Sequence, residues 1–205
     1  MKKKLKHLFL LCLFGMISIG ANAEIKSGEC GDNAKWSLDT TTGLLSITGS
    51  GDMTDYTSTG RIPWYNYRSN IKSLSIGDKI TSIGEYAFYD CSGLTSVTIP
   101  NSVTEIGARA FHGCSGLTSV TIPNSVTSIT GYAFSGCSSL PVVDNIRYAD
   151  TYLVEAVNKT LTTYNIKGGT KWIGAEAFYG CDKLTNVTIP NSVTSIGMYA
   201  FYHCI

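Results

Sequence analysis

Residues 94–116 read LTSVTIPNSVTEIGARAFHGCSG, and close copies of this stretch recur along the chain. The string TIPNSVT occurs at 98–104, 121–127 and 188–194, and the pattern Ala-Phe-x-x-Cys occurs five times. The cysteines of that pattern are spaced by 23, 23, 44 and 23 residues. In this register the chain contains five units, which are 71–93, 94–116, 117–139, 161–183 and 184–205. A fixed period of this length is typical of a solenoid.

The unit 94–116 shows how such a coil is built. The alternation Val97, Thr98, Ile99 predicts a short strand with one face inward, and Pro100 ends it because proline has no N–H to donate to a ladder. Eight positions are expected to face the core: Leu94, Val97, Ile99, Val103, Ile106, Ala110, Phe111 and Cys114. Gly107 is interpreted as permitting a bend. One coil cannot bury these side chains alone, so we expect coils to stack and their strands to pair in parallel.

The repeated unit resembles the BspA-like leucine-rich repeats of secreted and surface proteins. The resemblance implies a leucine-rich-repeat solenoid that is mainly β, with short parallel strands and little helix. The stretches at 27–31, 36–38, 45–49 and 63–65 resemble the entry segment of that family, and 145–167 resembles the β-hairpin that often interrupts its arrays.

The predicted organisation follows from these units. Residues 24–70 form an N-terminal capping segment, with a β-hairpin at 34–49 that covers the first coil together with Met53 and Trp64. Three 23-residue repeats fill 71–139, a β-hairpin insertion occupies 140–160, and two repeats fill 161–205. The last repeat is expected to have no cap, which predicts possible self-association through the C-terminal coil.

The first 23 residues have the form of a cleaved signal peptide. A basic start precedes an apolar run from Leu8 to Ile19 and a small-x-small site at Ala21-Asn22-Ala23. An apolar run of this length is too short to span a bilayer, and no later stretch is long enough. The sequence therefore predicts a protein that is secreted or held at the cell surface, with no membrane span.

Composition excludes several classes of protein. The chain is 43% hydrophobic and 15% charged, which argues against disorder, collagen and coiled coil. Its formal net charge of +1 becomes −3 once the four lysines of residues 1–23 are removed. Without a basic footprint, no nucleic-acid partner is expected.

The cysteines admit two interpretations. Five of the six beyond residue 23 occupy one column of the repeat: Cys91, Cys114, Cys137, Cys181 and Cys204. Disulfides between neighbours would suit an exported protein. We favour a column of buried reduced thiols, because the Cβ vectors of stacked coils should run parallel rather than face each other. Cys30 lies outside the column.

Chemical motifs are sparse. His112-Gly113-Cys114 and His203-Cys204 lack the paired ligand spacing of zinc sites, so neither a metal nor a cofactor is expected. No nucleophile elbow, zinc-protease or phosphate-loop pattern occurs, and no catalytic residues are assigned. The carboxylates, including Glu85, Glu105 and Glu176, are interpreted as surface charges. The chain is predicted not to be an enzyme.

Aromatic side chains bracket Ala-Phe in most coils and supply the candidate ligand-contact surface. The candidates are Tyr86, Tyr89, Arg109, His112, Tyr132, Tyr179, Tyr199 and Tyr202. Stacked tyrosines form a rigid amphipathic surface suited to protein or glycan contacts, but they could instead only shield the core. The family resemblance implies a non-enzymatic interaction or adhesion module with a protein or cell-surface ligand. The alternative is a glycan-binding module of a polysaccharide-uptake system.

Overall fold

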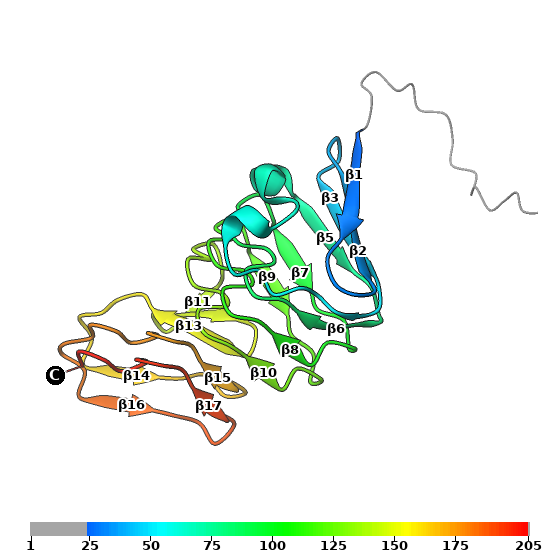
Figure 1. Cartoon of the computed structure of the whole chain (residues 1–205). Helices are drawn as coiled ribbons and strands as arrows, with labels where there is room; N and C mark the ends of the chain where they lie inside the picture. The colour runs from blue at the N-terminus through cyan, green and yellow to red at the C-terminus, as the bar shows by residue number, and fades with distance from the viewer. Residues whose placement is uncertain (1–23, 205) are drawn as a thin grey trace, which may run out of the picture.

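The computed structural model describes residues 24–204, and the expected signal peptide at 1–23 lies outside the described residues. The chain forms a solenoid of short strands (Figure 1). Within 24–204 the helical segments are two 3-10 turns, η1 (Thr59–Arg61) and η2 (Tyr65–Asn70). The predicted solenoid of short parallel strands with little helix is confirmed.

An antiparallel sheet covers the first coil. The hairpin of β2 (Ala34–Asp39) and β3 (Leu44–Gly49) forms as expected, and β3 pairs in parallel with β5 (Ser73–Ile76) of the first repeat. Strand β1 (Ile25–Glu29), which the sequence did not predict, adds antiparallel to β2. Trp64 is fully buried, donates from Nε1 to the carbonyl oxygen of Ala87 at 2.8 Å and stacks on Phe88 with ring centroids 5.9 Å apart. The cap thus supplies the first ring of the core column.

Each coil contributes two short strands. The first row contains β7 (Ser96–Thr98) and β9 (Ser119–Thr121), which pair in parallel at the 23-residue register. A second parallel row, in the order β10-β8-β6-β4, contains β4 (Gly51–Asp52), β6 (Ile80–Ile83), β8 (Glu105–Ile106) and β10 (Ser128–Ile129). The sequence predicts only an inward contact for this second segment, because two strand residues are too few to show alternation.

Stacked side chains fill the core. All eight positions of the unit 94–116 expected to face inward are buried. Phe111 stacks on Phe88 at 5.1 Å and on Phe134 at 5.3 Å between ring centroids. Gly107 permits a close approach of two coils, because a Cβ there would lie 2.6 Å from the backbone nitrogen of Glu85 in the preceding coil.

The described cysteines are all free thiols. In the repeat column, Cys114 Sγ lies 3.1 Å from the carbonyl oxygen of Phe88, and Cys137 Sγ lies 3.1 Å from that of Phe111. Each thiol therefore donates to the preceding coil. Burial raises the pKa of Cys91 to about 12 and that of Cys30 to about 11, which disfavours the reactive thiolate.

A three-stranded hairpin segment interrupts the array. Its strands β11 (Val142–Val143), β12 (Ile146–Ala149) and β13 (Tyr152–Ala156) pair antiparallel in sequence order. Strand β13 then starts a parallel row with β15 (Trp172–Ile173) and β17 (Ser195–Ile196), while β14 (Thr163–Asn165) pairs with β16 (Asn186–Thr188).

The hairpin divides the solenoid into two blocks. Among residues 24–204, no strand pairing joins β9 to β14 or β10 to β15. The carboxylate of Asp150 accepts a hydrogen bond from the backbone N–H of Ile122 at 2.8 Å. One coil earlier, the equivalent N–H of Ile99 bonds to the carbonyl oxygen of Thr121. A side chain of the hairpin thus replaces the backbone acceptor of the next coil.

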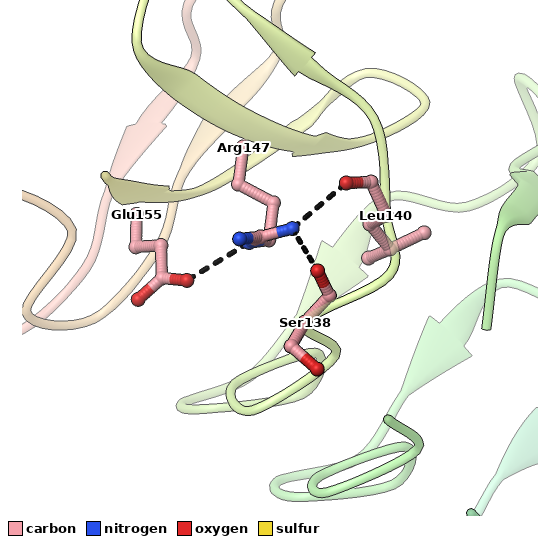
Figure 2. A network of polar contacts seen from close by, with 4 residues as sticks. All are labelled: Ser138, Leu140, Arg147 and Glu155. Carbon is pink, nitrogen blue, oxygen red and sulfur yellow. Dashed lines mark hydrogen bonds and ion pairs between the residues drawn. The ribbon is translucent and has the colours of Figure 1, made fainter. Parts of the chain in front are cut away.

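Arg147 fixes the hairpin to the third repeat (Figure 2). Its Nη1 donates to the carbonyl oxygens of Ser138 and, at 2.8 Å, of Leu140. Its Nε donates to Glu155 Oε1 at 2.9 Å across the β12–β13 pair. The guanidinium therefore connects the end of one coil to both long strands of the insertion.

Candidate interaction surface

The residue before each Ala-Phe pair has a left-handed backbone. The positive φ angles are 57° at Tyr86, 54° at Arg109, 62° at Tyr132, 57° at Glu176 and 56° at Tyr199. Only glycine adopts this conformation without steric cost. Hydrogen bonds between coils hold it in place, since the N–H groups of Tyr86, Arg109 and Glu176 each donate to a carbonyl of the following coil. All five coils thus present a non-glycine side chain from a strained position.

In the first three coils the candidate residues form one connected group. Arg109 donates from Nη1 to the Tyr86 hydroxyl at 3.0 Å, and its Cζ lies 5.5 Å from the Tyr86 ring centroid and 5.1 Å from that of Tyr132. Tyr89 contacts Tyr86 at 5.4 Å between centroids and stacks parallel on His112 at 4.9 Å. These five side chains are only partly exposed, so they already shield one another as the core-shielding interpretation requires.

The group continues across the hairpin. The Tyr132 hydroxyl donates to Glu176 Oε1 at 2.7 Å, although 44 residues separate them in sequence, and this bond raises the pKa of the Tyr132 phenol. Glu176 occupies the same repeat position as Tyr86, Arg109 and Tyr132 but is not among the predicted ligand-contact residues. Nothing in the sequence indicates that its carboxylate would contact a tyrosine of another block.

The last two coils hold a more exposed aromatic group. Tyr179 stacks on Tyr202 at 5.9 Å, and Tyr199 meets Tyr202 edge-on at 5.4 Å. Tyr199 and Tyr202 are 55% and 52% exposed, which leaves ring surface open to a ligand. His203, which the sequence analysis did not select, lies 4.3 Å from the Tyr202 ring centroid. We call the eight candidates together with Glu176 the aromatic stripe.

His112 is the titratable imidazole of the stripe. It is half-buried, and burial lowers its pKa. Its Nδ1 has no hydrogen-bond partner, and its ring stacks on Tyr89. The neutral ring is therefore the form that packs in this position.

Within residues 24–204 no three His, Cys, Asp or Glu side chains cluster closely enough to hold a metal ion. No helix in the same range has the length and apolar character needed to cross a bilayer.

The repeats match a known family model. The model, described as "BspA type Leucine rich repeat region", matches six copies over residues 63–152 and 157–205. A comparison with curated proteins found no match.

The chain is similar to solved structures of bacterial leucine-rich repeat proteins. A protein from Eubacterium ventriosum is 26% identical, with a TM-score of 0.50 over 87% of this chain and 63% of that one. A Bacteroides ovatus protein is 27% identical over 79% of this chain and 35% of that one, with a TM-score of 0.41. A "leucine rich cell surface protein" of Faecalibacterium prausnitzii is 24% identical over 92% of this chain and 54% of that one, with a TM-score of 0.44. This chain thus spans less than two thirds of the length of each of these three.

Proposed function

Because the chain belongs to the BspA-type leucine-rich repeat family, we propose that it is a non-enzymatic interaction module that binds a protein or cell-surface ligand through the aromatic stripe. The signal-like residues 1–23 support export, and an exported module would meet its ligand outside the cell. Leucine-rich repeats act as rigid scaffolds whose stacked coils present extended binding surfaces.

The left-handed backbone of the stripe carries this proposal. A single non-glycine residue with positive φ costs about 1–2 kcal/mol, and here the cost recurs in five coils. Glycine would remove it, and glycine does occupy the second left-handed column in three coils, at Gly113, Gly136 and Gly180, whereas Asp90 and His203 stand there in the other two. Because the left-handed backbone strain persists at positions that carry large side chains, we infer that those side chains have a function.

Glycine substitutions in the first block test the proposal. The triple variant Tyr86→Gly, Arg109→Gly, Tyr132→Gly removes three stripe side chains at positions where glycine fits the backbone. The wild type and the variant would be screened against immobilised matrix and plasma proteins and against whole cells. We expect binding by the wild type and a loss of about tenfold or more in the variant, since aromatic and arginine side chains dominate interfaces.

A matched control separates binding from folding. Asn145→Gly also relieves a left-handed residue, with φ of 66°, but lies in the exposed β11–β12 turn outside the stripe. It should leave binding unchanged. If the triple variant folds and binds as well as the wild type, the stripe is only a shield for the core and the proposal is wrong.

Glycan binding is a second candidate, restricted to the last coil. In the first block the ring of Tyr89 is covered by His112, and Arg109 lies against Tyr86 and Tyr132. Tyr199 and Tyr202 are the stripe residues with the most exposed rings and could stack on sugars. A glycan array with the wild type and Tyr202→Ala tests this function, and an array without signal removes it.

Self-association through the last coil also remains a proposal. Strand β17 lies at the edge of its sheet, and Ile189, Ile196 and Met198 are 40%, 51% and 67% exposed. Apolar strand edges without charged side chains recruit further strands. Sedimentation velocity over a range of protein concentrations would detect such association.

A further inference from the structure

The second strand row forms a surface distinct from the aromatic stripe. A groove of about 320 Å³ crosses β4, β6, β8 and the residue after β10, and it is lined by Asp52, Asp55, Glu85, Glu105 and Thr130. The adjoining residues Ile129 and Gly131 line a smaller notch of about 160 Å³. Thr130 of the groove thus lies between two residues that line the notch.

The notch lies where the two blocks of the solenoid meet. Tyr152 of the hairpin, Trp172 and Ile173 of β15, and Met198 line it. Tyr152 and Trp172 are buried, which gives the notch rigid aromatic walls, whereas Met198 is 67% exposed and flexible at its rim. The break between β10 and β15 leaves this apolar gap, which continuous stacking would have filled.

The groove is acidic. Two of its four carboxylates take part in recorded hydrogen bonds: Asp52 accepts one from the Thr81 hydroxyl at 2.7 Å, and Asp55 accepts one from the N–H of Glu85 at 2.8 Å. Within residues 24–204 none of the four forms an ion pair, and Asp52, Asp55 and Glu105 are exposed.

Lys171 directly precedes Trp172 of the notch, and its ammonium group already has contacts within the chain. It donates to Asn124 Oδ1 at 2.9 Å and lies 5.6 Å from the Trp172 ring centroid. The negative charge of the groove is therefore not neutralised by this neighbour.

We propose that the groove and notch form a docking site for an extended basic peptide segment of a partner protein, with one apolar side chain anchored in the notch. The charge of the groove selects basic side chains, and the apolar walls of the notch select the anchor. Neighbouring strands lie about 4.8 Å apart, so the carboxylates of β4 to β8 span about 10 Å, or roughly three extended residues. The ligand therefore carries two or three basic residues next to a leucine-sized or aromatic residue.

A defined peptide pair tests the site on the whole protein. Leu-Gly-Gly-Lys-Arg-Lys and its reverse sequence, each labelled with fluorescein at the basic end, would be titrated by fluorescence polarisation at 50 and 300 mM NaCl. At least one of the two peptides is expected to bind, and its binding should weaken at the higher salt concentration.

Two variants separate charge from anchoring. Glu85→Gln with Glu105→Gln removes two charges while keeping the shape of the side chains, and should weaken binding about fivefold at low salt. Gly131→Leu fills the notch without strain, because a Cβ at Gly131 meets nothing within 4 Å. It should weaken binding about tenfold, and a peptide with alanine in place of leucine should lose its sensitivity to this variant.

The matched controls lie elsewhere on the surface. Glu29→Gln with Asp182→Asn removes two exposed carboxylates outside the groove, and Gly168→Leu adds a side chain at another open glycine. Both should bind like the wild type.

Several results would overturn the proposal. The first is that neither peptide binds, and the second is that the control variants lose as much affinity as the groove and notch variants. The third is that the double glutamine variant weakens binding while Gly131→Leu does not, which would indicate only unspecific charge attraction. Self-association of the protein that Gly131→Leu abolishes would assign the notch to a second copy of the chain instead. The aromatic stripe is unchanged in all these variants, so its test remains independent.

Discussion

Removing the Arg147 side chain should weaken the junction between the two blocks. The Arg147 side chain is 12% exposed and reaches the carbonyl oxygens of Ser138, at the end of the third repeat, and of Leu140, as well as Glu155 of β13. A hydrogen bond to a charged group contributes about 1.5–3 kcal/mol, but the Glu155 contact counts less because that carboxylate is 44% exposed. With the Leu140 carbonyl left buried and unpaired, Arg147→Ala should lower the free energy of unfolding by about 2–4 kcal/mol.

Urea denaturation followed by circular dichroism and by tryptophan fluorescence would measure this loss. The core consists of two clusters of buried residues that meet at the hairpin, so a weakened junction should also split unfolding into two transitions. Glu155→Gln keeps an acceptor for Nε and should cost no more than about 1 kcal/mol. If Arg147→Ala unfolds within about 0.5 kcal/mol of the wild type in a single transition, Arg147 is not what couples the blocks.

Three further outcomes test the packing of the coils. Denatured, unreduced protein without residues 1–23 should react with about six equivalents of a thiol reagent. Native protein should react first at the half-buried Cys204 and slowly at Cys91, because the raised pKa of Cys91, about 12, suppresses its thiolate below that pH. Two or fewer reactive thiols after denaturation would show that disulfides are present. Val187→Lys on the inward side of β16 should unfold the last coil and abolish any self-association, whereas Thr188→Lys on the exposed side should be tolerated, as hydrogen exchange of that coil would show. Tyr56→Phe should leave stability unchanged or raise it by up to about 1 kcal/mol in thermal unfolding, because the buried Tyr56 hydroxyl has no partner to lose; a clear loss would reveal a bond to that hydroxyl.

The repeat made the stacked part of the fold predictable. Each inward position of the unit 94–116 could be assigned because apolar residues recur at a fixed period, and burial confirms all eight. The hairpin of β2 and β3 was predicted from alternation and turn residues, and the two strands pair antiparallel. Strand β1 was missed because Ser27, Gly28 and Glu29 show no apolar alternation and pair only through their backbone.

Features that depend on contacts between distant segments could not be predicted. Asp150 accepts a hydrogen bond that a backbone carbonyl accepts in other coils, and Arg147 contacts Ser138 and Leu140. Both features require the hairpin to lie on the third coil. The left-handed residues were also missed, because tyrosine and arginine rarely adopt positive φ and give no local signal for it. The acidic groove was invisible for a related reason, since Asp52 and Glu105 come together only when the second strand row forms.

The stripe is the feature that bridges the hairpin where the strands do not. Neither strand row pairs across the junction in the described part of the chain, and Phe134 meets Tyr152 at 5.5 Å between ring centroids instead of continuing the phenylalanine column. The Tyr132 hydroxyl nevertheless reaches Glu176 at 2.7 Å, so the first side chain of the stripe beyond the junction contacts the last one before it. This bond connects the stripe residues of the two blocks. If the stripe binds ligands as proposed, Glu176→Ala, which breaks the bond, should weaken the binding of ligands that contact both blocks more than that of ligands that contact one.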